Sequence, residues 1–331
     1  MTFQSIKDVF EAFNNLKVLI IGDVMVDAYD WGKVERISPE APVPIIHLEK
    51  RENRLGGAAN VALNIQALGA KPILCAAIGN DLDGDDFLKL LENQKMDNSG
   101  IVRSQSRVTT TKRRVIAGTQ HILRIDNETD KPLNTEDKKA ILLKIKELAT
   151  KVDVVIFEDY DKGVISEDII AETVALCKAQ NIPIAVDPKK RNFLHYKGVT
   201  LFKPNLKELK EGLKIDFNPD SATELKAAVN QLNEKLGAEN YFITLSERGV
   251  YIQSSAETHH ISAHLREISD VSGAGDTVIS TASLCLALGL PNKFLAELAN
   301  LSGGLVCEFV GVVPIEKDKL LKEAERLDLQ L

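Results

Sequence analysis

Short apolar runs alternate along this chain with longer stretches in which apolar residues recur at helical spacing. Such alternation is typical of strand–helix units, so it predicts an α/β fold with a mainly parallel sheet covered by helices. The runs with the length and content of buried strands are residues 18–21, 73–78, 152–157, 182–186, 199–202 and 242–245. There is no internal repeat and no low-complexity linker, and residues 1–331 are predicted to form a single domain.

Polar residues follow each of these predicted strands. The segments in question are Gly22-Asp23, Gly79-Asn80-Asp81, Glu158-Asp159-Tyr160, Asp187-Pro188, Lys203-Pro204-Asn205 and Ser246-Glu247. In open α/β sheets, ligands bind beyond the carboxyl ends of the strands. The sequence therefore predicts a binding site at that edge of the sheet.

Two stretches do not fit the alternation. Residues 31–48 are Pro-rich and extended in character, and residues 108–126 have the pattern of one or two β-strands. We expect the two stretches to pair as a small sheet over the strand ends, where it would act as a lid. A pair of surface hairpins is the alternative interpretation.

Residues 270–277 (Asp-Val-Ser-Gly-Ala-Gly-Asp-Thr) precede an apolar run, 278–290, that predicts a helix. A helix start presents unpaired backbone N–H groups and the positive end of the helix dipole, which suit an anion. Gly273, Ala274 and Gly275 allow a phosphate to approach that backbone closely. Asp276 falls in the first turn and is predicted to take a proton from a hydroxyl that attacks phosphorus. The alternative is an acid that only stabilises the helix dipole.

A second small-residue segment, residues 56–60 (Gly-Gly-Ala-Ala-Asn), is predicted to open a helix that ends near residue 68. Its glycines permit close backbone approach, and the amide of Asn60 can bond sugar hydroxyls. Tight helix packing is the alternative reason for the glycine pair. Asp27, after the first strand, has a carboxylate that two adjacent hydroxyls could share.

Asn205 and Glu208 stand three residues apart at a predicted helix start, so they face the same side. Hard oxygen ligands on one face suit Mg²⁺, which shares its remaining positions between water and nucleotide phosphates. An ordinary helix cap with an acid in its first turn explains the same pattern equally well.

The run from Thr109 to Arg114 carries several cations. In a strand, Thr110, Lys112 and Arg114 share one face, where two cations would suit an anionic substrate such as a sugar phosphate. A solvated charged surface is the usual alternative.

Composition excludes several function classes. With 41 basic and 48 acidic residues the net charge is −7, which disfavours a binder of nucleic acid or of anionic membranes. No apolar run approaches the roughly 20 residues of a membrane span, and no signal-peptide pattern is present, so a cytoplasmic protein is expected. The four cysteines lack metal or disulfide spacing and are expected to be buried thiols. The P-loop, the Gly-x-Ser-x-Gly motif and the three-glycine dinucleotide motif are absent.

Together, residues 56–60 and 270–277 resemble the two signature motifs of the ribokinase-like (PfkB) carbohydrate kinases. The resemblance extends over about residues 16–314 and implies a three-layer sandwich with a mainly parallel sheet and a small β-sheet lid. Within the family, the chain is most similar to the heptose 7-phosphate kinases of ADP-heptose biosynthesis. That similarity rests on residues 22–27, 36–44 (Arg-Ile-Ser-Pro-Glu-Ala-Pro-Val-Pro), 109–112, 124–126 and 159–163.

The resemblance implies a role for each matching residue. Asp276 would be the general base, and the backbone of Gly273, Ala274 and Gly275 the anion hole. Sugar hydroxyls would be held by Asp27, Gly56, Gly57 and Asn60.

For the cofactors, Asn205 and Glu208 match the family's Asn-x-x-Glu motif, which places Mg²⁺ through water. Ser246, Gly249 and Asn300 fall near the expected ATP pocket. Asp270 and Ser272 fall where many relatives bind a monovalent cation such as K⁺. Our own candidates for the substrate's 7-phosphate, which no motif fixes individually, are Lys112, Arg114, Lys162 and Lys189.

The implied reaction is ATP-dependent phosphorylation of D-glycero-β-D-manno-heptose 7-phosphate at its anomeric hydroxyl. A kinase for another sugar or sugar phosphate, and a catalytically silent sugar-phosphate sensor, are the alternatives. Bifunctional relatives carry a nucleotidyltransferase domain with a His-x-Gly-His motif after the kinase. This sequence ends at Leu331 without that motif, so a separate adenylyltransferase is expected as a pathway partner. A homodimer that pairs through the lid is also expected.

Overall fold

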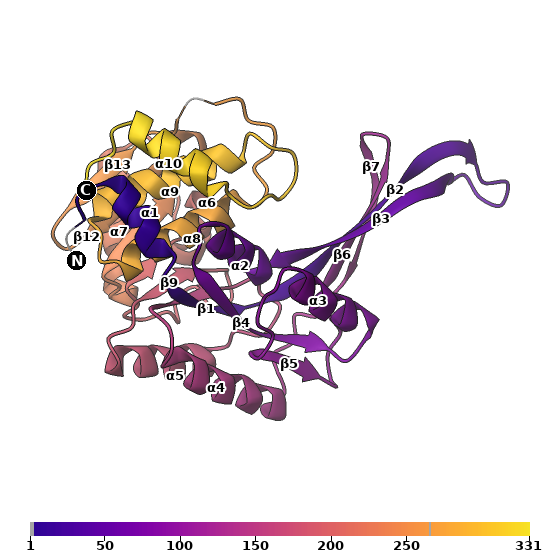
Figure 1. Ribbon diagram of the computed structural model, residues 1–331, viewed down its shortest axis with the longest axis horizontal. Coiled ribbons are helices and arrows are strands. Elements are labelled where there is room, and N and C mark those ends of the chain that lie inside the picture. The colour runs from indigo at the N-terminus through magenta and orange to yellow at the C-terminus, as the bar shows by residue number, and fades with distance from the viewer. Residues whose placement is uncertain (1–2, 265) are drawn as a thin grey trace.

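The computed structural model describes residues 3–264 and 266–331, and its centre is a nine-stranded sheet (Figure 1). The strand order is β13-β12-β11-β10-β9-β8-β1-β4-β5, and only β12 and β13 run antiparallel to their neighbours. The strands of this sheet are β1 (Lys17–Gly22), β4 (Lys71–Gly79), β5 (Ile101–Ser104), β8 (Val154–Glu158), β9 (Ile184–Asp187), β10 (Leu201–Phe202), β11 (Asn240–Thr244), β12 (Val250–Ser254) and β13 (Thr258–Ile261). The prediction of a mainly parallel sheet is confirmed.

Helices cover both faces of the sheet and give three layers (Figure 1). One face carries α1 (Ile6–Phe13), α2 (Ala58–Ala67), α3 (Leu82–Asn93), α8 (Ala274–Ala287), α9 (Asn292–Val306) and α10 (Lys317–Arg326). The other carries α4 (Thr135–Ala149), α5 (Glu167–Ala179), α6 (Leu206–Leu213) and α7 (Ala222–Leu236). None of these described helices has the length and apolar content that a bilayer span requires.

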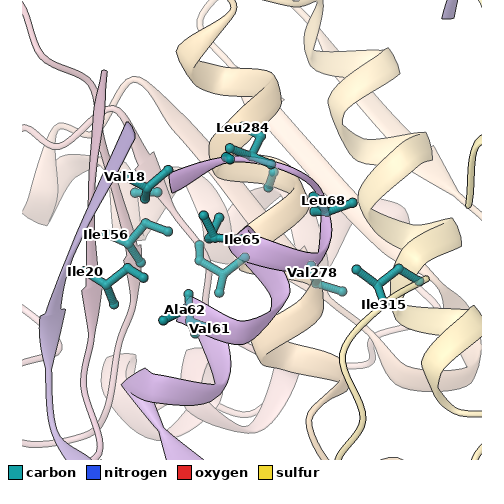
Figure 2. Close-up of a cluster of buried hydrophobic side chains, with 14 of the residues drawn as sticks. Val18, Ile20, Val61, Ala62, Ile65, Leu68, Ile156, Val278, Leu284 and Ile315 are labelled. Carbon is teal, nitrogen blue, oxygen red and sulfur yellow. The ribbon is translucent and has the colours of Figure 1, made fainter. Parts of the chain in front are cut away.

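Strand β1 shows why its sequence is apolar throughout. Val18 and Ile20 pack into the core on the α2/α8 side, whereas Leu19 and Ile21 pack into the core on the α4/α5 side. A strand alternates its side chains between faces, so a strand covered on both faces needs apolar residues at every position. Figure 2 shows the first of these cores, in which α2 lies between the strands and α8. Ile65 of α2 is fully buried there, and its truncation to alanine would cost about 2–5 kcal/mol.

A separate four-stranded sheet projects from the body at the right of Figure 1. Its order is β3-β2-β6-β7, and β2 pairs in parallel with β6. The strands are β2 (Val24–Ile37), β3 (Pro44–Gly57), β6 (Thr111–Ala117) and β7 (Gln120–Asn127). The predicted pairing of residues 31–48 with residues 108–126 in one small sheet is therefore confirmed.

The predicted boundaries of this sheet were too narrow. Strand β2 begins at Val24, so Asp27 lies within the lid sheet rather than in a loop after the first strand. The reason is that Val24, Val26 and Ala28 are buried in the main core, and the strand extends from that core into the lid. The predicted strand 199–202 is also shorter than expected, because only Leu201–Phe202 keeps ladder pairing.

Candidate active site

Helix α8 begins where the sequence predicted a helix start. Gly273 is the N-cap residue, with a φ of 79°, a left-handed conformation that glycine adopts without strain. No side chain caps this end, so the helix start keeps backbone N–H groups available for an anion. Asp276 lies in the first turn and is only 8% exposed. The loop therefore places a buried carboxylate beside an uncapped helix start.

Two side chains from other parts of the chain hold this carboxylate. The amide Nδ2 of Asn60, in the first turn of α2, donates to Oδ2 of Asp276 at 2.6 Å. The hydroxyl of Tyr160, which follows β8, donates to Oδ1 at 2.9 Å. Each carboxylate oxygen thus has one donor and keeps a further lone pair for a substrate hydroxyl.

Further charges gather at the carboxyl ends of β8, β9 and β10. Oxygens of Glu158, Asp187 and Asp276 lie within 4.8 Å of one another, and all three residues are buried. Lys203, itself 2% exposed, reaches Asp187 at 2.7 Å and supplies positive charge to this cluster. A side chain on Gly275 would lie 3.8 Å from Asp187 and 4.0 Å from the Lys203 ammonium. The ion pair therefore lies next to the start of α8.

The surroundings of this cluster raise the pKa values of two of its carboxyl groups. Burial raises the pKa of Asp276 to about 6, the hydrogen bonds from Asn60 and Tyr160 oppose this, and the charge of Asp187 adds to it. Burial also raises the pKa of Glu158 well above its usual range, with the charges of Asp187 and Asp276 acting in the same direction. Asp276 is therefore ionised at neutral pH and is more basic than an exposed aspartate.

Burial lowers the pKa of Lys203, but the charges of Asp187, Glu208 and Glu158 outweigh it, so the pKa of this lysine is raised. The ammonium stays charged inside the protein. It is a fixed cation at the place where the sequence predicted a phosphate.

The predicted sugar-binding residues meet where the lid joins the body. Gly56 and Gly57 end β3 and lead into α2, and Gly57 has a φ of 60°. A Cβ on Gly56 would lie 2.3 Å from Oδ2 of Asp27, so glycine is needed for that carboxylate to lie against the strand. Arg114 of β6 donates to the other oxygen of Asp27 at 2.6 Å. The structure thus brings Asp27, Gly56 and Gly57 together.

Asn205 and Glu208 form a capping box at the start of α6. The side chain of Asn205 accepts from the Glu208 N–H, and the Glu208 carboxylate accepts from the Asn205 N–H, each at 2.8 Å. The second Glu208 oxygen accepts from Lys189 at 2.5 Å. The capping interpretation is confirmed, and it places hard oxygen atoms at the same edge of the sheet as Asp187.

Three of the four cations expected to bind the substrate's phosphate are paired with carboxylates. Arg114 pairs with Asp27, Lys162 with Glu128 at 2.7 Å, and Lys189 with Glu208. Lys112 has no ion-pair partner among residues 3–264 and 266–331. Of the four cations, Lys112 is therefore the one whose charge no neighbouring carboxylate neutralises in an ion pair among the described residues.

The residues expected near the nucleotide meet around residues 261–263. Asn300 of α9 donates to the Ser262 carbonyl at 2.9 Å, and a Cβ on Gly249 would meet the Ile261 carbonyl. Ser246, the first residue of the short helix before Gly249, has a φ of 55°. The Gly249 N–H donates to the Ser246 carbonyl at 3.0 Å, so Ser246 lies beside Gly249, while Gly249 and Asn300 lie against residues 261 and 262.

In the segment expected to bind a monovalent cation, Asp270 and Ser272, the Asp270 carboxylate accepts hydrogen bonds from backbone N–H groups. Asp270 accepts from the N–H groups of Ser272 and Gly311, each at 2.9 Å. These bonds lower the pKa of Asp270, with the Ser272 N–H as the largest cause, so its carboxylate stays ionised. The loop before α8 is thereby tied to residue 311.

Four residues of the site received no role from the sequence: the buried Glu158, Asp187 and Lys203 and the half-buried Tyr160. Each follows or ends a core strand, in the polar segments predicted to gather at one edge of the sheet. Their position after a predicted strand was the only sequence signal that these four residues belong to the site. Which of these side chains touch Asp276 depends on the tertiary arrangement.

Comparison with solved structures establishes the class of fold. Phosphofructokinase-2 from Escherichia coli in complex with potassium superposes with a TM-score of 0.76 at 16% identity, covering 95% of this chain and 99% of that one. Arabidopsis thaliana ribokinase complexed with ribose and ATP gives a TM-score of 0.71 at 17% identity over 93% of this chain and 99% of that one. The fold is the ribokinase-like α/β sandwich with a lid sheet, as predicted.

Sequence comparison then establishes the family. The profile of the pfkB family of carbohydrate kinases matches residues 15–318, and the chain belongs to this family. "Bifunctional protein HldE" of Methylobacillus flagellatus is 39% identical over 309 residues, which are 93% of this chain and 63% of that protein. The protein of the same name from Trichlorobacter lovleyi is 37% identical over 320 residues, 96% of this chain and 65% of that protein. The chain thus spans less than two thirds of the length of these relatives.

Proposed function

We propose that this chain transfers the γ-phosphoryl group of Mg·ATP to the anomeric hydroxyl of D-glycero-β-D-manno-heptose 7-phosphate, giving the 1,7-bisphosphate and ADP. Membership of the carbohydrate kinase family supports the reaction type. The similarity to proteins named HldE, together with the segments that resemble heptose 7-phosphate kinases, supports the substrate. We assign this activity to one kinase domain, residues 1–331, acting in the cytoplasm; adenylyl transfer is a different reaction, which we do not assign to these residues.

The single observation that carries the proposal is the buried Asp276 at the uncapped start of α8. Asp276 takes the proton of the 1-hydroxyl as that oxygen attacks the γ-phosphorus. The new P–O bond forms as the bond to the bridging oxygen breaks, and ADP leaves with the electron pair. A base with a pKa of about 6 is ionised at neutral pH and accepts the proton more readily than an exposed aspartate.

Stabilisation of charge accounts for most of the remaining rate enhancement in this proposal. The transferring group carries negative charge on its equatorial oxygens. In this proposal the developing charge lies against the backbone of residues 273–275 and the ammonium of Lys203. The Ala274 N–H already donates to the Val271 carbonyl at 3.3 Å, so the N–H groups of Gly273 and Gly275 are the donors left for the phosphoryl group, and burial strengthens their contribution and that of Lys203.

The metal expected for this chemistry is Mg²⁺, which neutralises phosphate charge when bound. Carboxylate and amide oxygens at Glu208 and Asn205 fit its preference for hard donors. Both Glu208 oxygens already accept a hydrogen bond, which suits contact with the metal through water. Ser246, Gly249 and Asn300 are assigned to ATP, and Asp270 and Ser272 to K⁺.

On the substrate side, Asp27, Gly56, Gly57 and Asn60 are assigned to sugar hydroxyls. The buried Oδ1 of Asn60 has no hydrogen-bond partner among the described residues, so it is available to accept from a sugar hydroxyl. For the 7-phosphate, Lys112 is the leading candidate because it lacks a carboxylate partner, followed by Arg114, Lys162 and Lys189.

The lid also supports a homodimer. Val34, Ile37, Val43 and Leu48, on the β2–β3 hairpin, are each at least 40% exposed. Exposed apolar residues gathered on one element are typical of an interaction surface. We assign this surface to lid–lid pairing, which size-exclusion chromatography with light scattering tests directly.

The experiment that tests the function is coupled ADP release from purified protein and Mg·ATP with a panel of acceptors. The panel holds heptose 7-phosphate, fructose 6-phosphate, fructose, ribose and adenosine. Turnover on heptose 7-phosphate well above the others supports the proposal. Preferred turnover on another acceptor keeps the mechanism but discards the heptose substrate.

A further inference from the structure

The segment that links β8 to α5 is anchored to a buried carboxylate. Asp23 is 1% exposed, and its Oδ2 accepts from the backbone N–H groups of Tyr160 and Lys162, each at 3.0 Å. Its Oδ1 accepts from the N–H of Val164, also at 3.0 Å. Three bonds from alternate residues to one carboxylate fix the path of the backbone around Tyr160.

A second carboxylate, Asp159, anchors the same segment from the other side. It accepts from Asn192 at 3.0 Å and from the Tyr196 hydroxyl at 2.7 Å. It also accepts from the N–H of Asp161, whose φ of 56° is left-handed. The segment is thus held at both ends of Tyr160 by buried, hydrogen-bonded acids.

These anchors fix the position of the Tyr160 hydroxyl. Tyr160 donates to Oδ1 of Asp276 at 2.9 Å, while Asn60 holds Oδ2 at 2.6 Å. Two donors from different elements fix the plane of a carboxylate, which a single donor would leave free to rotate. We infer that Tyr160 is a positioning residue that orients Asp276 toward the attacking hydroxyl, an inference that rests on the proposed function.

Tyr160 also connects the two halves of the site. The ammonium of Lys189 lies 5.6 Å from the centre of its ring, within the range of a cation–π contact. Lys189 in turn donates to Glu208 of the capping box. The ring therefore lies between the proposed metal-binding residues and the proposed base.

The hydroxyl matters because most of the titratable groups around Asp276 are acids. Glu158 of β8 and Asp187 of β9 face it, and Lys203 after β10 is the neighbouring cation. From α2 it meets the uncharged Asn60. Donation from Tyr160 favours the ionised form of Asp276, so loss of the hydroxyl leaves burial and Asp187 to raise the pKa further.

The test is the pH dependence of kcat/KM in the Tyr160→Phe variant, which keeps the ring and removes only the hydroxyl. We expect the acidic limb to move upward by about one pH unit and kcat to fall about tenfold. KM for ATP should be unchanged. A merely structural role would lower the rate without moving the limb, and that result would overturn the inference.

Tyr196→Phe is the matched control, since it also removes a tyrosine–aspartate hydrogen bond, but to Asp159. Asp159 keeps its bonds from Asn192 and from the Asp161 N–H, so the Tyr160 segment stays anchored and the acidic limb of this variant should stay where the wild-type limb lies. An equal displacement in both variants would show that any loss in this network moves the limb, and would contradict a specific role for Tyr160.

A readout that needs no turnover separates this inference from the proposed function. Carboxyl carbon NMR of ¹³C-aspartate protein, with the Asp276 signal assigned from Asp276→Asn, reports the titration directly. A higher pKa in Tyr160→Phe supports the inference even where heptose 7-phosphate proves not to be the substrate. An identical titration in wild type and Tyr160→Phe refutes it, whatever the substrate.

Discussion

The Nδ2 of Asn60 lies 2.6 Å from Oδ2 of Asp276, although 216 residues separate the two in sequence. Both stand in the first turn of a helix that follows a glycine, α2 in one case and α8 in the other. The contact brings the two segments that resemble kinase motifs to one point. It also fixes which way Asn60 faces, because the amide nitrogen is used by Asp276 and the oxygen is left for a ligand.

Replacement of Asp276 by asparagine should abolish most turnover while leaving substrate binding intact. Loss of a general base lowers kcat by about 10²- to 10⁴-fold. Steady-state kinetics, with calorimetry for ATP binding, measures the two effects separately. Asp216→Asn, at an exposed position, is the control and should be near wild type. Near-normal turnover in Asp276→Asn would remove the base assignment.

The same substitution should remove a stability penalty that grows with pH. The pKa of Asp276 rises from 3.8 to about 6 on folding. The folded state therefore retains a proton that the unfolded state loses, and stability falls as pH rises from about 4 to about 6. That penalty is about 1 kcal/mol larger at pH 8 than at pH 5.

Urea unfolding of wild type and Asp276→Asn at both pH values measures this difference. The variant should gain stability relative to wild type between pH 5 and pH 8. An unchanged difference between the two proteins would show that the Asp276 carboxylate is not destabilised by its surroundings.

Lys203 should be essential for stability. Its removal as Lys203→Met leaves Asp187 buried and unpaired beside Glu158, which costs about 3–5 kcal/mol. Removing both partners, as Lys203→Met with Asp187→Leu, should recover part of that loss. Lys50→Met, which breaks an exposed pair with Glu52, should cost less than about 1 kcal/mol. Equal effects at Lys203 and Lys50 would contradict the buried charge cluster.

Lys112→Ala should raise KM for the sugar phosphate about tenfold and leave KM for ATP nearly unchanged. The physical reason is the loss of one charge-assisted contact to the 7-phosphate. Arg113→Ala is the neighbouring control, because Arg113 points to the opposite face of β6 and contacts Asp30 at 3.2 Å. An unchanged sugar KM in Lys112→Ala would place the phosphate site elsewhere.

The start of α8 could be predicted because its signals are local. A glycine-rich loop before an apolar run marks a helix start, and Asp276 falls in the first turn whatever the rest of the chain does. The pairing of the lid segments also followed from pattern, since neither segment fits the alternation of short apolar runs with helical stretches. The early start of β2 could not be predicted from the pattern, because Val24 and Val26 are buried by residues distant in sequence.

The partners of Asp276 could not be predicted individually. Tyr160 lies 116 residues away, and the sequence indicates only that the polar segments after the strands converge at one edge. Asn205 and Glu208 show a different limit. The same Asn-x-x-Glu spacing serves a capping box and a metal-binding pair, and only coordinates reveal that both Glu208 oxygens are engaged.

Phosphorus NMR of the product that the purified protein makes from heptose 7-phosphate and Mg·ATP tests the proposed reaction most directly. We expect a second phosphate signal coupled to the anomeric proton, which identifies the 1,7-bisphosphate, and no such signal with Asp276→Asn. A phosphate on another carbon, or equal product from Asp276→Asn, would contradict this proposal.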